Sequence, residues 1–182
     1  MAFESEADEI ARAAAGDRAA QSALVNRHMP RAYAVARRML RSDEDAEDVT
    51  QEAFLRAWKA LPNWEPRAKF STWLYRVTLN LCYDRLRKKR ETLMDEPPER
   101  EDDAPRPEQA LAARQEKSLL DAAIAELPDR QKAAITLCAI EGFSNIEAAE
   151  MLEASVEAVE SLLARARRAL KSKLADRMEL SR

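Results

Sequence analysis

The stretch that decides the fold is FSTWLYRVTLNLCYDRLRKKR, residues 70–90. Apolar side chains recur in it at spacings of three and four, which places them on one face of an α-helix. These side chains are Phe70, Trp73, Leu74, Val77 and Leu81. A second face carries residues that can hydrogen-bond: Thr72, Arg76, Asn80, Tyr83 and Arg87. The spacing therefore predicts a single long helix with an apolar face, a polar face and a cationic end at 85–90.

Two interpretations of this helix remain open from the segment alone. Hydrogen-bonding side chains, aromatic rings that can stack on bases and a positive terminus suit unpaired nucleic acid. The other interpretation is a core helix with one solvated face, whose long basic side chains keep their charged ends in water.

Composition favours an all-α fold. Only two of the 182 residues are glycine, which argues against a turn-rich β fold, and 46 % are hydrophobic, which is enough for a core. No apolar run approaches the roughly 20 residues that span a bilayer. The N-terminus also lacks an apolar signal core. We therefore expect a cytoplasmic protein with no membrane insertion, in which Cys82 and Cys138 are buried and reduced.

A proline- and acid-rich segment divides the chain. Residues 93–110 contain four prolines and seven acids, a composition that disfavours both helix and sheet. We predict two small helical domains, 1–92 and 115–182, joined by a flexible linker, 93–114. Their net charges are +3 and −2, and the linker carries −4. Because phosphate contacts supply most non-specific DNA affinity, any nucleic-acid role needs local basic patches or a partner.

The N-terminal domain reads as a helical bundle, with helices expected over 5–15, 18–40 and 43–61. One stripe of the third helix is polar and mostly acidic: Asp45, Asp48, Gln51 and Glu52. Acids in a first turn complement the helix dipole. The six acids between 43 and 52 exceed that need, so this stripe is also a candidate docking face for a basic partner.

The C-terminal domain has helix-start and helix-end residues at the positions typical of a helix-turn-helix. Pro128 opens one helix, and Gly142 suits its C-terminal end. Ser144 and Glu147 match a capping box ahead of a short helix over 145–152. A tight turn precedes a longer helix that runs to about 174. Many helical hairpins share this pattern, so it indicates DNA binding without establishing it.

No catalytic set competes with a binding role. The single histidine, His28, is expected to be a surface or partly buried helix residue. The sequence shows no glycine-rich phosphate loop, serine nucleophile elbow or cysteine–histidine metal spacing. We expect a protein that is not an enzyme, with no metal and no cofactor.

Both halves resemble the extracytoplasmic-function (ECF) group of the bacterial σ70 family, over about 20–92 and 117–174. DAEDVTQEAFLRAWKAL, residues 45–61, resembles region 2.2, which docks on the β′ clamp of RNA polymerase. Residues 70–90 resemble regions 2.3 and 2.4, which open and read the −10 element. Residues 127–170 resemble region 4, which reads the −35 element. The two long motifs occur in the family's order and at its separation.

The resemblance implies three sets of site residues. Those for core polymerase are Asp48, Gln51, Glu52 and Trp58. Those for the −10 element are Trp64, Lys69, Trp73, Arg76, Asn80 and Arg87. Those for the −35 element are Ser155, Glu157, Glu160, Ser161, Arg165 and Arg168. Within the loop 62–69, Trp64 would stack on a flipped base and Asn80 would hydrogen-bond its edge.

The C-terminal motif departs from the family pattern. Glu153 stands where the turn usually has glycine, and Glu160 and Leu162 stand where basic residues are common. The promoter sequence that relatives recognise therefore cannot be assigned to this chain. Glu160 either accepts a hydrogen bond from a cytosine amino group or points away from DNA and pairs with Arg167 or a neighbour.

The implied partners are core RNA polymerase, through its β′ clamp and β flap, promoter DNA, and an anti-sigma factor wedged between the domains. A second reading is a sigma-mimicking adaptor that binds an anti-sigma factor without initiating transcription. The presence of Trp73, Asn80 and the cationic residues 85–90 favours the first.

Overall fold

The structure is a computed structural model, and it describes residues 5–64, 69–95 and 119–180. Its elements are α1 (Glu6–Ala14), α2 (Arg18–Leu40), α3 (Asp43–Ala60), η1 (Leu61–Asn63), α4 (Phe70–Asp95), α6 (Asp129–Ile135), η2 (Thr136–Ile140), α7 (Asn145–Met151) and α8 (Val156–Leu180). Residues 119–125 form a further short helix before α6. The part of the chain that the structure describes is thus all-α, as predicted. None of its helices has the length and apolarity needed to cross a membrane.

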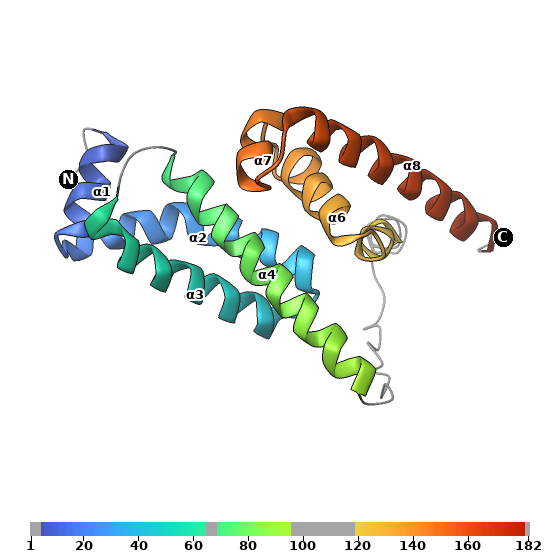
Figure 1. The fold of residues 1–182 in the computed structure, drawn as a ribbon, viewed down its shortest axis with the longest axis horizontal. Coiled ribbons are helices and arrows are strands. Elements are labelled where there is room, and N and C mark those ends of the chain that lie inside the picture. Colours follow the sequence, from blue (N-terminus) through green and yellow to red (C-terminus); the bar gives the residue numbers. More distant parts are fainter. Residues whose placement is uncertain (1–4, 65–68, 96–118, 181–182) are drawn as a thin grey trace, which may run out of the picture.

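The N-terminal half is a bundle in which α2, α3 and α4 pack on one another, with α1 across the far end (Figure 1). Polar residues at the helix starts explain the boundaries. Asp17 accepts the backbone N–H groups of Ala19 and Ala20, and Ser42 accepts that of Asp45 at 3.1 Å. Such caps satisfy backbone donors that the first turn leaves free.

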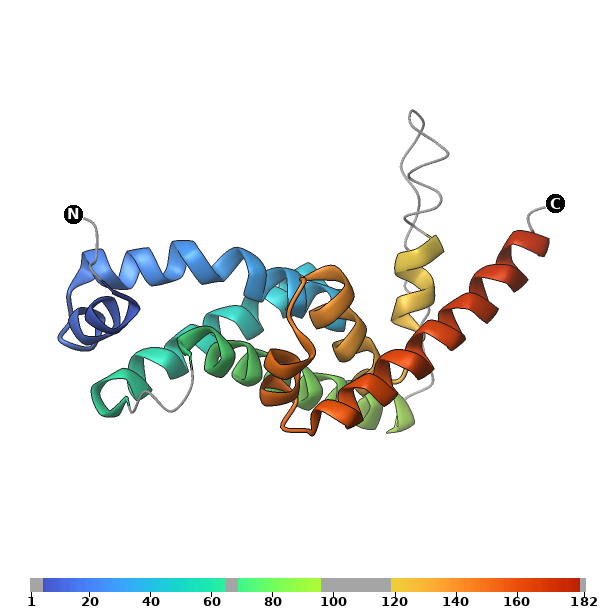
Figure 2. The same cartoon turned by 90° about the horizontal axis from the view of Figure 1, so that it is seen from above.

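The C-terminal half forms the predicted helix-turn-helix. The helix that begins at Asp129 widens into a π-helical turn at Thr136–Ile140, and Gly142 follows with a φ of 74°. The capping box is present, because Ser144 and Glu147 each hydrogen-bond the other's backbone N–H. In the next turn Glu153 takes a φ of 50°, so a non-glycine residue occupies the left-handed conformation. The long helix α8 then extends past the rest of the molecule (Figure 2).

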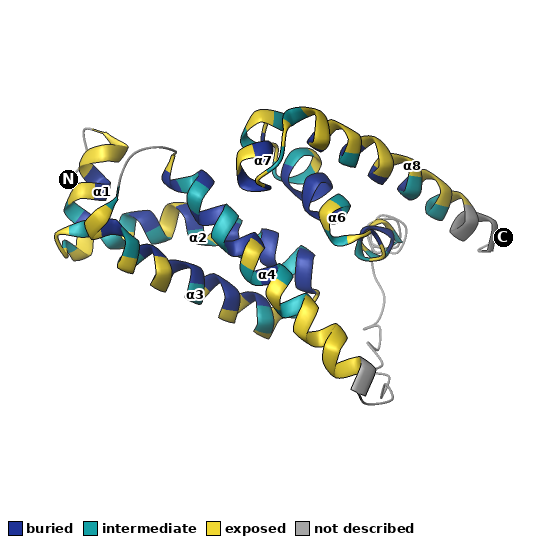
Figure 3. Cartoon of the chain, viewed as in Figure 1, coloured by how far each residue is buried: buried dark blue, intermediate teal, exposed yellow. Residues whose placement is uncertain are grey.

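The two halves share a hydrophobic core. One cluster of buried side chains joins residues of α2, α3 and α4 to residues of α6, α7 and α8, and Tyr75, Leu79 and Cys82 are its α4 members. A second cluster lies within the N-terminal half, among α1, α2, α3, η1 and the start of α4. In Figure 3 the buried residues of α4 run along most of the helix, and its last turns are exposed.

This packing changes three expectations about residues 70–95. Thr72, placed on the polar face by spacing, is only 4 % exposed, and Tyr83 is half-buried. Both differences arise because α4 contacts α2 and α3 on one side and α7 on the other. The helix also ends at Asp95, inside the predicted linker, most of which lies outside the described residues. The helix α8 is longer than predicted as well, since it continues to Leu180 instead of 174.

Candidate polymerase- and nucleic-acid-binding surfaces

The polar face of α3 is accessible to solvent, and arginines pair with some of its carboxylates. Asp48 and Gln51 are exposed, and Glu52 is partly exposed and paired with Arg56 at 2.8 Å. Arg85 of α4 reaches across to Asp45 at 2.9 Å and to Asp48 at 3.4 Å. Part of the predicted negative charge is therefore balanced within the bundle.

Two apolar features accompany this face. Leu55 is 53 % exposed, and it lies four residues after Gln51 and three before Trp58, so spacing alone places it on the same face. Trp58 is half-buried, with its ring 5.8 Å from that of Phe54. A groove of about 390 Å³ borders the face, and residues of α2 such as Val25 line it together with Gln51. Sequence analysis missed Leu55 and the groove.

The proposed −10 residues lie along α4 and the segment before it. Trp64 and Trp73 are half-buried and meet edge to face, with ring centroids 5.7 Å apart. Arg76 is partly exposed, whereas Lys69 and Asn80 are exposed. Residues 65–68 of the predicted recognition loop lie outside the described residues. The structure thus places an aromatic pair beside two cations and an exposed amide, which are groups suited to unpaired bases and phosphates.

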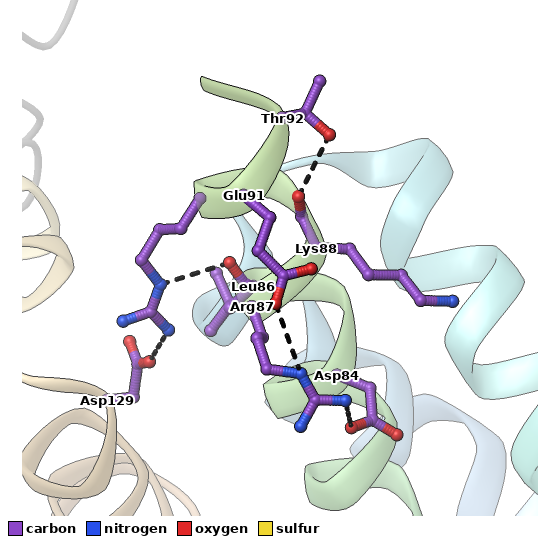
Figure 4. A network of polar contacts seen from close by, with 8 residues as sticks. Asp84, Leu86, Arg87, Lys88, Glu91, Thr92 and Asp129 are labelled. Atoms are coloured by element: carbon purple, nitrogen blue, oxygen red, sulfur yellow. Dashed lines mark hydrogen bonds and ion pairs between the residues drawn. The ribbon is translucent and has the colours of Figure 1, made fainter. Parts of the chain in front are cut away.

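The cationic end of α4 is partly engaged in polar contacts (Figure 4). Arg87 is exposed and pairs with Asp84 at 3.0 Å and with Glu91 at 4.0 Å. Arg90 pairs with Asp129 of α6 and donates to the Leu86 carbonyl at 3.2 Å. Both guanidinium groups are exposed, so DNA phosphates can compete for them.

The proposed −35 residues form an outward row on α8 and at its start. All six are exposed: Ser155, Glu157, Glu160, Ser161, Arg165 and Arg168. The opposite face is buried through Val159, Leu163 and Ala166. The hydroxyl of Ser155 accepts the backbone N–H of Ala158 at 3.1 Å and caps the helix. Hydrogen bonds from the helix backbone and from Ser155 lower the pKa of the Glu157 carboxyl.

Glu160 lies in the middle of this row. It is exposed, and within the described part of the chain no ion pair joins it to Arg167 or to any other residue. The structure thus leaves its carboxylate accessible to a ligand on this face.

The structure brings residues proposed for the −10 element close to residues proposed for the −35 element. One cleft of about 850 Å³ is lined by Trp64, Trp73 and Arg76 from the N-terminal half and by Glu153 and Ser155 from the C-terminal half. Arg76 pairs with Glu153 at 3.6 Å, and Lys69 pairs with Glu147 at 3.4 Å. Ser144 donates two hydrogen bonds to Glu147, and these lower the pKa of that carboxyl with help from Lys69.

A second group of contacts joins the halves closer to the core. Arg31 of α2 donates to the backbone carbonyl of Glu141 and lies 3.3 Å from its carboxylate. The same guanidinium sits over the Phe143 ring, 3.9 Å from its centroid, and Tyr75 packs against that ring at 5.2 Å. Sequence analysis missed Arg31, because nothing in the local pattern distinguishes it from a solvated helix arginine.

The histidine and the two cysteines are wholly or partly buried in the fold. His28 is only 6 % exposed, which corrects the expectation of a surface or partly buried residue, and burial lowers its pKa to about 4. Burial raises the pKa of the Cys82 thiol to about 12. Cys138 is half-buried instead of buried, and its pKa is also raised by burial. Among the described residues, no group of three or more His, Cys, Asp or Glu side chains could hold a metal ion.

Two family models match the chain: Sigma-70 region 2 over residues 24–92 and Sigma-70 region 4 over residues 117–170. The chain is 37 % identical to the ECF sigma factor SigE of Mycolicibacterium smegmatis over 89 % of its own length and 65 % of that protein. It is 33 % identical to SigW of Bacillus subtilis, covering 88 % of this chain and 92 % of SigW. For CnrH of Cupriavidus metallidurans the identity is 36 %, over 93 % and 95 % of the two chains.

Solved structures resemble the whole fold. CnrH, in complex with the cytosolic domain of CnrY, superposes with a TM-score of 0.71 at 33 % identity, covering 92 % of this chain and 96 % of CnrH. RpoE of Bartonella quintana, in complex with the anti-sigma factor NepR, superposes with a TM-score of 0.69 at 25 % identity. The match covers 85 % of this chain and 96 % of RpoE. The chain therefore belongs to the ECF group of σ70-family RNA polymerase sigma factors.

Proposed function

We propose that this chain binds core RNA polymerase and directs it to a specific class of promoters. The observation that carries the proposal is the match to sigma factors such as SigW and CnrH along nearly the whole length of both chains. The exposed faces of α3, α4 and α8 support it, because each presents the chemistry that one step of initiation requires. The chain itself performs no catalysis in this proposal, since polymerase makes the RNA in the cytoplasm.

Core polymerase binds to the polar face of α3 in this proposal. Asp48, Gln51 and Glu52 supply charge and hydrogen bonds to the β′ clamp, and Leu55 and Trp58 supply apolar area. A patch of this kind, with an apolar centre and a polar rim, is typical of protein interfaces. The C-terminal domain contacts the β flap.

Promoter opening belongs to α4 and the residues before it. Trp64 stacks on an unpaired base and Asn80 hydrogen-bonds its edge, while Lys69, Trp73, Arg76 and Arg87 hold the separated strand. Stacking on an aromatic ring contributes about 1–3 kcal/mol per base, which is enough to favour an opened duplex.

The −35 element is read by α8 as a recognition helix in the major groove. Arg165 and Arg168 contact phosphates or guanine, and Ser155 fixes the helix start. Glu157, Glu160 and Ser161 present acceptors and donors to base edges. The exposed row on α8 supports this assignment.

An anti-sigma factor is the proposed regulator. CnrH and RpoE, both similar to this chain, were solved in complexes with CnrY and NepR. A partner that covers both the α3 face and α8 would block polymerase and DNA together. Binding through two domains gains from effective concentration, so the intact chain would be held more tightly than either domain.

Transcription in vitro tests the proposal and separates it from the adaptor reading. Purified core polymerase is incubated with the chain and a library of genomic fragments, and the 5′ ends of the transcripts are sequenced. We expect start sites that share one −10 and one −35 sequence and that vanish when the chain is omitted. Binding to an anti-sigma factor with no chain-dependent transcript would support the adaptor instead.

A further inference from the structure

Three arginines at the C-terminal end of α2 lie around one cleft. Arg37, Arg38 and Arg41 line it together with residues of the short helix 119–125, and its volume is about 480 Å³. None of the three belongs to the sets proposed for polymerase or for the promoter. Cations in the last turn of a helix complement the helix dipole. That role explains Arg37 and Arg38, whereas Arg41 follows the last helical residue.

The carboxylates at this cleft do not balance its arginines. Arg37 pairs with Asp43, and Arg38 pairs with Asp121 at 3.0 Å. Arg41 is exposed, and among the described residues no ion pair or side-chain hydrogen bond engages its guanidinium. Two carboxylates thus face three guanidinium groups, and the excess positive charge lies on Arg41.

A buried lysine adds to the positive charge near Arg41. Lys132 of α6 is only 5 % exposed, and within the described part of the chain no hydrogen bond or ion pair joins its ammonium group to another residue. Burial lowers its pKa; Asp129 counteracts this effect, and the like charges of Arg41 and Arg90 add to it. Buried charges are usually paired. An anion held by Arg41 would offset the repulsion, so Lys132 is a separate observation that favours a negative ligand here.

The cleft also has an apolar wall. Tyr33 and Ala34 line it from α2, and Ile124 lines it from the helix 119–125. The hydroxyl of Tyr33 donates to Asp43 at 3.0 Å, which orients the ring. The volume is far larger than a single phosphate needs, and it lies within the range of small-molecule sites. Arginines beside an aromatic ring suit a ligand that joins phosphates to a planar base, because guanidinium groups bind phosphate oxygens in pairs.

We propose that this cleft binds a nucleotide with two or more linked phosphates, with Arg37, Arg38 and Arg41 on the phosphates and with Tyr33 and Ile124 against the sugar and base. Linked phosphates fit better than one, because four residues of helix separate Arg37 from Arg41, a rise of about 6 Å. Arg38 exchanges its exposed carboxylate partner for a phosphate, at little cost. The inference does not depend on the proposed function, since it concerns the chain without polymerase or promoter.

Isothermal titration calorimetry of the full-length chain with ATP and GTP, in buffer without divalent cations, tests the site. Arg41→Gln and Arg18→Gln are matched variants, because each removes one charge from an exposed arginine at one end of α2. We expect Arg41→Gln to weaken nucleotide binding about tenfold or more, through loss of a charge-assisted hydrogen bond. Arg18→Gln should change affinity less than twofold, and thermal unfolding checks that both variants remain folded. Equal losses, or no binding of either nucleotide to the parent chain, would overturn the proposal.

Smaller ligands test which part of the nucleotide each wall holds. AMP lacks the linked phosphates, and inorganic pyrophosphate lacks the sugar and base, so we expect each to bind at least about tenfold more weakly than ATP. Tyr33→Ala should weaken binding of ATP and leave that of pyrophosphate unchanged. AMP that binds as tightly as ATP would contradict the role of the linked phosphates. Pyrophosphate that binds as tightly as ATP would contradict the assignment to a nucleotide.

Two further measurements separate this site from a contact to DNA. Asp121→Asn should raise affinity for ATP about two- to fivefold, because it releases Arg38 from an exposed ion pair. An unchanged affinity would contradict the role of Arg38. Titration with duplex DNA of random sequence should give the same affinity for the parent chain and for Arg41→Gln. Weaker DNA binding by Arg41→Gln, in a chain that binds no nucleotide, would assign these arginines to the DNA backbone and overturn the proposal.

Discussion

Glu160 is the residue on which the DNA preference of this chain most depends under the proposed function. It is exposed on α8 between residues assigned to the −35 element, and no ion pair holds it within the described part of the chain. A carboxylate repels phosphates, and it accepts a hydrogen bond from the cytosine amino group. Under the proposed function, contact with DNA through this carboxylate would weaken indiscriminate binding while favouring particular base pairs.

We predict that Glu160→Gln raises affinity for random duplex DNA and reduces discrimination in favour of the proper −35 element. One base-pair preference of this kind is worth about 1–3 kcal/mol. Selection from a randomised −35 library, with sequencing of bound fragments, measures both effects. Arg165→Ala is the companion variant, and it should weaken binding to the −35 element. An unchanged preferred sequence with Glu160→Gln would mean that this carboxylate does not contact DNA.

His28 gives the fold a pH dependence. Burial lowers its pKa to about 4, below the ordinary value of 6.5, and its ring packs against Phe70 and Tyr75. The folded state therefore favours neutral imidazole. Its contribution to the free energy of unfolding is complete above pH 6.5 and is lost as the pH falls from 6.5 towards 4.

We predict that His28→Leu makes the free energy of unfolding depend less on pH between pH 7 and pH 4. The parent chain should lose about 2–3 kcal/mol more stability than the variant between pH 7 and pH 4. Urea unfolding at both pH values measures the difference, and comparing the two chains cancels the titration of carboxylates that they share. Parallel pH profiles for both chains would show that His28 is not held neutral by the fold.

At the scale of elements, α3 carries the polymerase-binding prediction. Charge reversal at both Asp48 and Glu52 should weaken binding to core polymerase at least tenfold, since it places two positive charges on a face proposed to meet a basic clamp. Fluorescence titration with core polymerase measures this effect. Glu44→Lys, an exposed reversal in the first turn of the same helix, is the control and should bind nearly normally. Equal loss in the control would assign the effect to net charge.

The element α4 carries the prediction about strand opening. Asn80→Ala should impair open-complex formation on duplex promoter more than on a template with a pre-formed bubble, because the opened base would lose its hydrogen-bond partner. Permanganate footprinting of unpaired thymines measures opening. Asn80 is a cleaner probe than Trp64, whose ring also packs against Phe70 and Trp73. Equal defects on both templates would assign Asn80 to docking.

Most elements were predictable from local signals, whereas the second packing face of α4 was not. The capping box of Ser144 and Glu147 located the start of α7 correctly, and the expected ranges of α2 and α3 match the structure closely. Tyr83 packs against the core cluster that joins the two halves, and Thr72 lies buried at the cleft between them. Local periodicity cannot reveal a contact between segments separated by an acidic, proline-rich stretch.

At the scale of the whole molecule, the linker composition predicted two helical domains, and the all-α fold with its two halves agrees with that. The linker gave no sign that the halves share a core cluster, which includes Tyr75 from α4 and Phe143 from the C-terminal half. The proposed site residues were taken from the family motifs, and their roles stay predictions; the structure shows which of them are exposed. Their meeting in one cleft was not predictable, because the partner of Arg76 is Glu153, a residue the family pattern usually replaces by glycine.

A distance measurement tests the central claim, that the two halves of this sigma factor share a core in the free chain and separate when α4 and α8 contact the two promoter elements. Spin labels at Ala19→Cys on α2 and Ser172→Cys on α8, both exposed, would report the separation of the halves. Cys138→Ala removes the more accessible native thiol. Double electron–electron resonance should give one narrow, short distance in the free chain and a distance longer by tens of ångströms in the promoter complex with core polymerase. The same distance in both states would contradict the account.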